Sequence, residues 1–402
     1  MATTRSTPSG KASPSTGTDT VGDKASDSKA DAIPPEACVL VLQGGGALGA
    51  YQGGVFEALC ERCREPAWVA GISIGAINAA LIAGNPPEMR VRRLREFWEL
   101  VSSSTPAMLP DFLSHLRPSF NDAVATQVLL FGVPGFFVPR VPPPALQPRG
   151  TPQAVSYYDT VPLRRTLERL VDFDRINDGP IRLSVGAVNV RTGNFQYFDT
   201  RRERLDARHI MASGALPPGF PAVEIDGEAY WDGGIVSNTP LDYVLSEPGD
   251  GRRVVFQVDL FSAHGPMPTT LNEVSEREKD IRFSSRTRLT TNIAVERQAK
   301  ALAAKRLTAK LPAELRHDPD LLALTAVPCE APLDVVHLIY RSKHYETLSK
   351  DFEFSRQTMN EHWDSGRADM AHTLHHRRWI AHDRNAPGIH VFDLTGDSPI
   401  AT

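Results

Sequence analysis

Cysteine is scarce in this sequence, and its pattern excludes several kinds of site. The four cysteines are Cys38, Cys60, Cys63 and Cys329, too few and too irregularly spaced for a disulfide framework. Cys60 and Cys63 form a C-x-x-C pair, but no second cysteine pair or matching histidine pair completes a metal site. We therefore expect reduced thiols and predict no metal site.

Long apolar runs and a surplus of one charge are also missing. The 44 basic and 48 acidic residues give a net charge of −4, without the concentrated basic surplus of a nucleic-acid-binding protein. No stretch reaches the roughly 18 consecutive apolar residues of a transmembrane helix. Residues 1–32 contain no apolar segment, so we predict no signal peptide. The simplest location is the cytoplasm, although secretion without a cleavable signal remains open.

Short apolar runs alternate with helical patterns along most of the chain. Buried strands are predicted at 39–42 and 68–70, each followed by a glycine-rich turn and a helix, at about 50–64 and 76–83. Further helices are predicted at about 88–101, 160–171, 207–213, 273–310 and 351–376, and further strands at 183–190, 194–198, 254–260, 335–340 and 390–394. This alternation predicts a three-layer α/β/α fold with a mostly parallel central sheet.

Residues 132–152 interrupt the pattern with many prolines. Proline disfavours helices and central strands, so this segment is predicted to be a long loop, a kind of loop that often has a function. Phe131, Phe136 and Phe137 lie in or next to it. They either contact a membrane interface or cover an acyl channel, or they pack on the core, and the sequence favours neither interpretation.

The pattern G-x-S-x-G occurs at Gly71-Ile-Ser73-Ile-Gly75, between a predicted strand and a predicted helix. A serine on such a sharp turn projects above the edge of the sheet, and flanking glycines avoid steric clashes there. The helix that follows places its positive end near the hydroxyl. The context supports a nucleophilic serine, but by itself the motif leaves a chance match in a glycine-rich chain as an equal alternative.

A second glycine-rich turn, Gly44-Gly45-Gly46-Ala-Leu48-Gly49, also lies between a strand and a helix. It fits the dinucleotide-binding pattern G-x-G-x-x-G, which requires an acidic residue at the end of the next strand. The available acids, Glu61 and Glu65, lie within or just after the first helix instead. The better interpretation is an oxyanion hole made of glycine N–H groups.

A nucleophilic serine needs a base, which is usually histidine. None of the twelve histidines lies in an obvious motif, although one far along the chain could still be a partner in space. Asp232, followed by Gly233 and Gly234, could approach a serine closely. An aspartate with its ordinary pKa of about 3.9 is a weak base unless its surroundings raise that pKa.

Together, these three motifs and the segment Ala212-Ser-Gly-Ala-Leu-Pro-Pro-Gly-Phe-Pro221 resemble the patatin-like phospholipase family over roughly 39–260. The resemblance implies a Ser–Asp dyad, with Ser73 as nucleophile and Asp232 as proton acceptor, on a patatin-like fold. It implies an oxyanion hole at Gly44, Gly45 and Gly46; the remaining motif glycines are Gly49, Gly71, Gly75, Gly233 and Gly234. One departure is Leu48, where many members have arginine, so oxyanion stabilisation would rest on backbone donors alone.

We therefore expect a disordered tail at residues 1–35, a catalytic core at 36–262 and a C-terminal extension at 263–402 packed on the core. The expected function is lipid acyl hydrolysis without a cofactor. The expected partners are a lipid or other acyl-ester substrate and, peripherally, a membrane, but not nucleic acid. One alternative is a non-catalytic lipid-binding or regulatory protein, for which Leu48 and the extended C-terminal region are the motivation. The other is a dinucleotide-dependent enzyme, suggested only by G-x-G-x-x-G.

Overall fold

The computed structural model describes residues 38–62, 65–105, 108–247, 251–326, 332–343 and 345–395. All of them lie in one structural unit, Ile33–Thr402. The expected disordered tail at residues 1–35, Cys63 and Cys329 lie outside the described residues.

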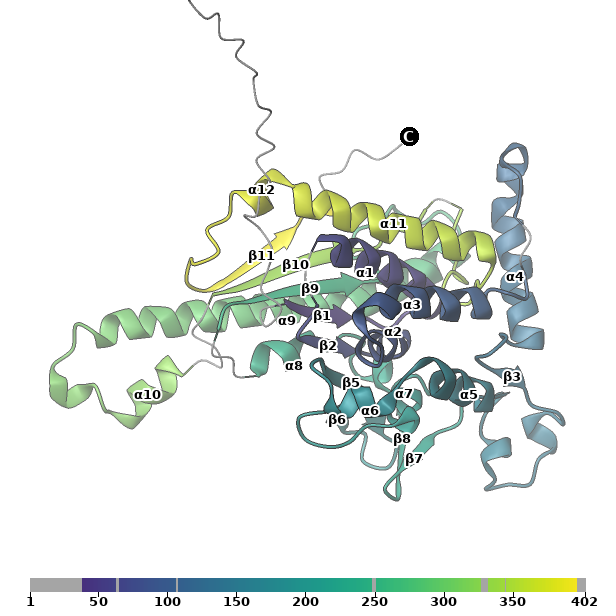
Figure 1. The fold of residues 1–402 in the computed structure, drawn as a ribbon, viewed down its shortest axis with the longest axis horizontal. Coiled ribbons are helices and arrows are strands. Elements are labelled where there is room, and N and C mark those ends of the chain that lie inside the picture. Colours follow the sequence, from purple (N-terminus) through teal and green to yellow (C-terminus); the bar gives the residue numbers. More distant parts are fainter. Residues whose placement is uncertain are drawn as a thin grey trace, which may run out of the picture. The chain divides into compact units, whose positions relative to one another are not determined.

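A nine-stranded sheet forms the centre of this unit (Figure 1). Its strands are β1 (Cys38–Leu42), β2 (Trp68–Gly71), β5 (Arg182–Asn189), β6 (Phe195–Asp199), β7 (Val223–Ile225), β8 (Glu228–Asp232), β9 (Arg253–Asp259), β10 (Leu333–Ile339) and β11 (Ile389–Asp393). Strands β11, β10, β9, β1, β2 and β5 are parallel neighbours in that order. Strands β6, β7 and β8 join in antiparallel pairs. The predicted α/β fold with a mostly parallel sheet is confirmed.

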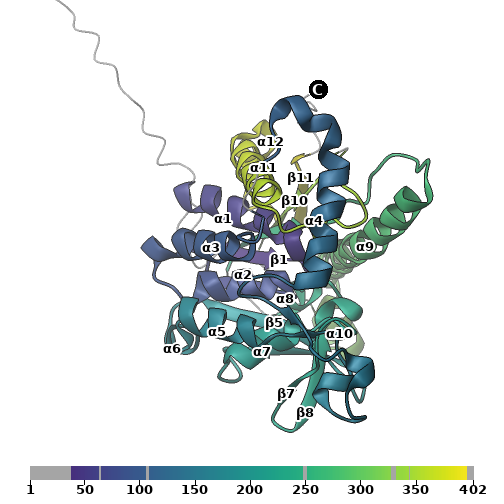
Figure 2. The same ribbon diagram turned by 90° about the vertical axis from the view of Figure 1, so that its right-hand side faces the viewer.

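Helices cover both faces of the sheet, which makes three layers (Figure 2). On one face lie α1 (Ala50–Arg62), α2 (Ile74–Ala83), α3 (Pro87–Val101) and α11 (Arg356–His375); on the other lie α8 (Leu241–Ser246) and α9 (Leu271–Thr308). The other helices are α4 (Arg117–Phe131), α5 (Val161–Leu170), α6 (Phe173–Asp178), α7 (Ala207–Ser213), α10 (Pro319–Thr325) and α12 (Arg377–Ile380).

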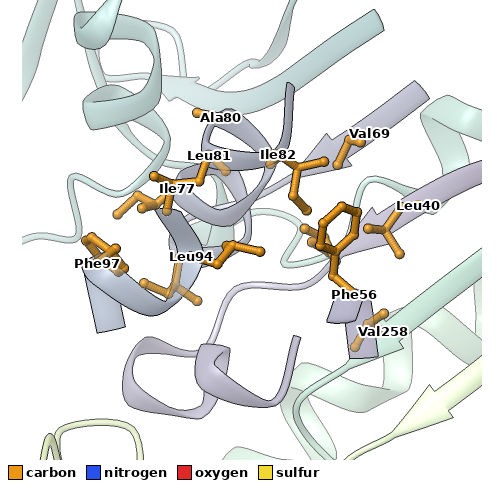
Figure 3. Packing of buried hydrophobic residues seen from close by; sticks show 14 of the residues in the cluster. Leu40, Phe56, Val69, Ile77, Ala80, Leu81, Ile82, Leu94, Phe97 and Val258 are labelled. Atoms are coloured by element: carbon orange, nitrogen blue, oxygen red, sulfur yellow. The ribbon is translucent and has the colours of Figure 1, made fainter. Parts of the chain in front are cut away.

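The neighbouring central strands β1 and β2 are apolar throughout because both of their faces are buried. In β1, Leu40 and Leu42 pack in the larger hydrophobic cluster, on the side of α1 and α2, whereas Val39 and Val41 pack in a second cluster with α8. Figure 3 shows part of the larger cluster, where Phe56 of α1 and Ile82 of α2 lie close to Leu40. Successive side chains of β1 therefore pack against the helical layers on opposite faces of the sheet.

The residues after position 262 are built into the same sheet, because β10 and β11 extend it beyond β9. Helix α11 also crosses α1 at very short range. A Cβ added at Gly54 would lie 1.8 Å from the carbonyl oxygen of Trp363, and one added at Gly366 would lie 2.0 Å from that of Tyr51. Glycine at both positions allows direct contact between the backbones of α1 and α11, so the C-terminal region packs closely on the first helix.

The structure differs from the sequence prediction in several local elements. The helix expected from residue 351 begins only at Arg356, after the Ser355 side chain caps it by accepting a hydrogen bond from Thr358 N–H. Residues 351–352 instead form a turn and residues 353–355 are irregular; Asp351 contacts the glycine-rich turn, as described below. Helix α4 and strands β7 and β8 were not predicted, because their apolar residues do not follow a clear helical or strand period.

The proline-rich segment is irregular, as predicted, apart from short 3-10 turns and strand β3 (Val138–Pro139), which pairs with β4 (Tyr158–Asp159). Phe136 and Phe137 are buried, whereas Phe131 at the end of α4 is 71% exposed. Phe136 and Phe137 thus pack in the core cluster, and they also line the cavity described below. Among the described residues, no helix combines the length and apolarity needed to cross a bilayer.

Candidate active site

Ser73 lies on a sharp turn between β2 and α2, with backbone angles φ 56° and ψ −122°. A non-glycine residue rarely has a positive φ, so the surrounding structure must impose it. The flanking glycines make this possible: a Cβ at Gly71 or at Gly75 would lie 2.3 Å from a backbone carbonyl oxygen. The predicted strand–turn–helix arrangement is therefore present, with the Ser73 side chain only half-buried.

The backbone of Ser73 contacts α7 and begins α2. Its N–H donates to the Ser213 hydroxyl of α7 at 3.0 Å. Ser73 is also the N-cap of α2, whose first N–H groups and helix dipole create a positive potential near the hydroxyl. This potential favours negative charge that develops next to Ser73.

Asp232 ends β8 and lies close to Ser73, although it is 159 positions away in the sequence. Its carboxylate accepts a hydrogen bond from Gly234 N–H at 2.7 Å. The residue is only 2% exposed. Burial raises the pKa of Asp232 to about 7, and the Gly234 N–H and the nearby Ser73 side chain partly oppose that rise. The setting therefore makes this carboxylate a much better base than an ordinary aspartate.

The glycines after Asp232 allow its close approach to the sheet and to the turn. A Cβ at Gly233 would lie 2.7 Å from the carbonyl oxygen of Gly186 in β5. A Cβ at Gly234 would lie 2.9 Å from Oδ1 of Asn238 and 3.1 Å from Oδ1 of Asp232. Both positions accept a larger side chain only if neighbouring atoms move.

The glycine-rich turn lies against Ser73, but its three glycines are not equivalent. Gly44 N–H donates to the backbone carbonyl of Asn238 at 3.1 Å, and Asn238 Nδ2 donates to the Gly44 carbonyl at 2.8 Å. This corrects the expectation that Gly44 supplies an oxyanion donor, because its N–H already has an acceptor. Gly45 and Gly46 donate their N–H groups to no acceptor within the described part of the protein.

Gly44 and Gly49 have a packing role. A Cβ at Gly44 would lie 3.0 Å from Cβ of Ser73 and 2.3 Å from Oδ1 of Asn238. A Cβ at Gly49 would lie 2.6 Å from Cγ1 of Ile74, so the turn and α2 are in direct contact there. Leu48 is fully buried in the core and does not line the cavity.

Ser73 and Asp232 open onto a cavity of about 410 Å³. Gly44, Gly45, Gly46 and Gly234 line it too, so the structure brings most of the candidate residues together. The cavity lining does not include the other four motif glycines, Gly49, Gly71, Gly75 and Gly233. The apolar wall consists mainly of aromatic residues: Phe136, Phe137, Tyr157, Tyr158, Phe220, Phe261, Phe283, Phe352 and Phe354. None of the described residues that line the cavity is a histidine.

Several lining residues were not found from the sequence. Asn238 follows Asp232 by six positions, in no motif that marks it. Phe283, Asp351, Phe352 and Phe354 come from the C-terminal region, and only the fold brings them to the cavity. In the described parts of the chain, no group of three or more histidine, cysteine, aspartate or glutamate side chains could bind a metal ion.

Two family models match the sequence. One, described as patatin-like phospholipase, matches residues 40–245, and the other, described as patatin phospholipase, matches residues 281–386. No curated protein sequence matches the chain.

Similar solved structures include VipD from Legionella pneumophila (14% identity, TM-score 0.34), the type III effector protein ExoU (15%, 0.30) and human GIVD cytosolic phospholipase A2 (12%, 0.38). The matches cover 84%, 85% and 84% of this chain, and 66%, 53% and 58% of those chains, respectively. The chain thus spans about half to two thirds of the length of these proteins.

Proposed function

Since this chain belongs to the patatin-like phospholipase family, we propose that it hydrolyses acyl esters of lipids with Ser73 as nucleophile and Asp232 as proton acceptor. The observation that carries the proposal is that Ser73 and the buried, high-pKa carboxylate of Asp232 line the same apolar cavity. A nucleophile in contact with its base is the arrangement that covalent acyl transfer requires.

In the first step, Ser73 Oγ attacks the ester carbonyl carbon while Asp232 takes the hydroxyl proton. A base works best when its pKa is near the working pH, and the pKa of about 7 of Asp232 meets that condition. The site needs no histidine for this proton transfer.

The tetrahedral intermediate carries negative charge on the former carbonyl oxygen. We assign its stabilisation to the N–H groups of Gly45 and Gly46, together with the N-terminal end of α2. By analogy with other hydrolases, one such donor contributes about 3 kcal/mol to transition-state stabilisation. Gly44 supports the site differently, by allowing the turn to lie directly against Ser73.

The intermediate then collapses. The alcohol leaves with the proton held by Asp232, and an acyl group remains on Ser73. A water molecule, deprotonated by Asp232, attacks the acyl-enzyme and releases the fatty acid, so the same carboxylate acts in both halves of the reaction.

The cavity supports a substrate with a long apolar part, because aromatic side chains line most of it. Its rim also supports peripheral contact with a lipid surface. Leu129, Tyr157 and Leu216 line the cavity while remaining about half exposed, and the adjacent Leu130 and Phe131 are more exposed still. A continuous apolar rim of this kind is typical of sites that contact membranes or other partners.

The proposal is tested with a fluorophosphonate probe, a short p-nitrophenyl ester and phospholipid vesicles. We expect Ser73→Ala to abolish labelling and all ester hydrolysis, and Asp232→Asn to lower kcat by at least about 1000-fold. The matched controls are Ser103→Ala and Asp242→Asn, which change the same residue types at exposed positions. Full activity in either active-site variant would refute the dyad. A wild-type protein that binds lipid but does not react with the probe would support the non-catalytic alternative.

A further inference from the structure

The segment of residues 345–354, here called the strap, contacts the glycine-rich turn through Asp351, although it comes from the C-terminal region. Ala47 N–H donates to the backbone carbonyl of Asp351 at 2.9 Å. Gly46 has φ +55°, and a Cβ there would lie 2.2 Å from the same carbonyl oxygen. The Asp351 carbonyl therefore contacts the backbone directly after the two glycines that we assign as oxyanion donors.

The side chain of Asp351 is bound to α9. Its Oδ1 lies 2.5 Å from Nζ of Lys279, and both side chains are largely buried. Nζ of Lys279 also lies 3.4 Å from the carbonyl oxygen of Leu348 and 5.3 Å from the ring centre of Phe352. One lysine thus contacts three residues of the strap.

A second lysine binds the strap to the same helix. Lys350, whose side chain is only 1% exposed, lies 3.0 Å from Oε1 of Glu276 and 3.0 Å from Oδ2 of Asp280. Near-complete burial of a paired charge makes its geometry strongly preferred, because either partner left alone would be an uncompensated buried charge.

Helix α9 also contacts the start of the glycine-rich turn. Gln43 Nε2 donates to the backbone carbonyl of Phe283 in α9 at 3.2 Å, and its Oε1 accepts from Leu260 N–H at 2.6 Å. Residues on both sides of Gly44–Gly46 are therefore hydrogen-bonded to the C-terminal region. Gln43, which precedes these glycines, bonds to Phe283, and Ala47, which follows them, bonds to Asp351.

We propose that Asp351 is a positioning residue for ester hydrolysis. Its carboxylate, bound to Lys279, fixes the carbonyl that orients the backbone of residues 45–47 toward the reacting oxygen. This role rests on the proposed function, because it matters for catalysis only if Gly45 and Gly46 bind an oxyanion. Small displacements of such donors are costly, since their stabilisation depends on distance and direction.

The test compares Lys279→Met, Asp351→Ala and the exchanged pair Lys279→Asp with Asp351→Lys. We expect each single variant to lower kcat for a short ester about 10-fold with little change in KM, and the exchanged pair to recover part of the loss. The matched control is Lys300→Met, which removes an exposed salt bridge to Glu296 on the same helix. It should leave kcat unchanged.

Hydrogen exchange of a peptide covering residues 43–49 gives a readout that does not depend on activity. Exchange should be faster in Lys279→Met and Asp351→Ala than in the wild type and unchanged in Lys300→Met. Unchanged exchange in the single variants would overturn the inference even if the wild type hydrolyses no ester. Faster exchange with an unchanged kcat would overturn the catalytic role of the strap. An inactive, unlabelled wild type with faster exchange in the variants would instead refute the proposed function alone.

Discussion

Gly44 and Asn238 exchange two hydrogen bonds, one from Gly44 N–H to the Asn238 carbonyl and one from Asn238 Nδ2 to the Gly44 carbonyl. These bonds join the glycine-rich turn to the segment that follows Asp232. The pair thereby couples the position of the proposed oxyanion donors to that of the proposed base.

Asn238→Ala should weaken this coupling. The substitution leaves the buried carbonyl of Gly44 without its side-chain donor, which should lower the free energy of unfolding by about 1–3 kcal/mol. Because the turn lies directly against Ser73, we also expect kcat to fall about 10-fold. Denaturant unfolding and steady-state kinetics on a short ester measure the two effects. Unchanged kcat with reduced stability would limit Asn238 to a structural role.

Activity should depend on the protonation of Asp232. The carboxylate accepts a proton only when it is ionised, so kcat/KM should rise with pH and level off above the pKa of about 7. The measurement is a pH profile on a short ester without ionisable groups. A profile that is flat from pH 5 to pH 8 would contradict the role of Asp232 as the base.

The same raised pKa makes a separate prediction about stability. The folded protein binds a proton at Asp232 at higher pH than the unfolded chain does, so the resulting stability is complete below about pH 4 and is lost as the pH rises to about 7. The three-unit shift corresponds to about 4 kcal/mol at most. Asp232→Asn should therefore gain stability relative to the wild type over this range, measured by urea unfolding at several pH values. No relative gain would indicate that Asp232 is not buried in the folded protein.

Gly46→Ala should inactivate the enzyme for steric reasons. The added methyl group would lie 2.2 Å from the Asp351 carbonyl oxygen, in a backbone conformation that already disfavours alanine. We expect at least a 100-fold loss of kcat, as for the loss of one oxyanion donor. Gly193→Ala is the matched control: Gly193 also has a positive φ, of +70°, but a methyl group there meets no atom within 4 Å. Equal losses in the two variants would show that backbone strain alone is responsible.

The exposed rim should matter only for lipid assembled in a membrane. Leu130 and Phe131 are 62% and 71% exposed and adjoin the cavity-lining Leu129. Replacing both with aspartate should reduce hydrolysis of phospholipid vesicles about 10-fold and leave hydrolysis of a short water-soluble ester unchanged. Leu324→Asp, at an equally exposed site on α10, is the control. A loss on both substrates would point to damage to the cavity, and no loss on vesicles would refute membrane contact through this rim.

Elements that are local in sequence could be predicted from it. The turn at Ser73 depends on one strand, two glycines and one helix within about fifteen residues, and the structure contains all of them. Strands β1 and β2 could be predicted because burial on both faces favours short uninterrupted apolar runs. Asp232 was associated with Ser73 only through the family resemblance, since no local pattern links two residues so far apart.

What the sequence by itself determined is therefore the layered fold and the chemical identity of the candidate groups. The tertiary structure decided which of these groups are available for catalysis. The N–H of Gly44 is hydrogen-bonded to the carbonyl of Asn238, 194 positions away, and burial raises the pKa of Asp232. It also brings Asp351 onto the glycine-rich turn. Burial and long-range hydrogen bonds depend on where distant segments meet, and no local pattern of residues contains that information.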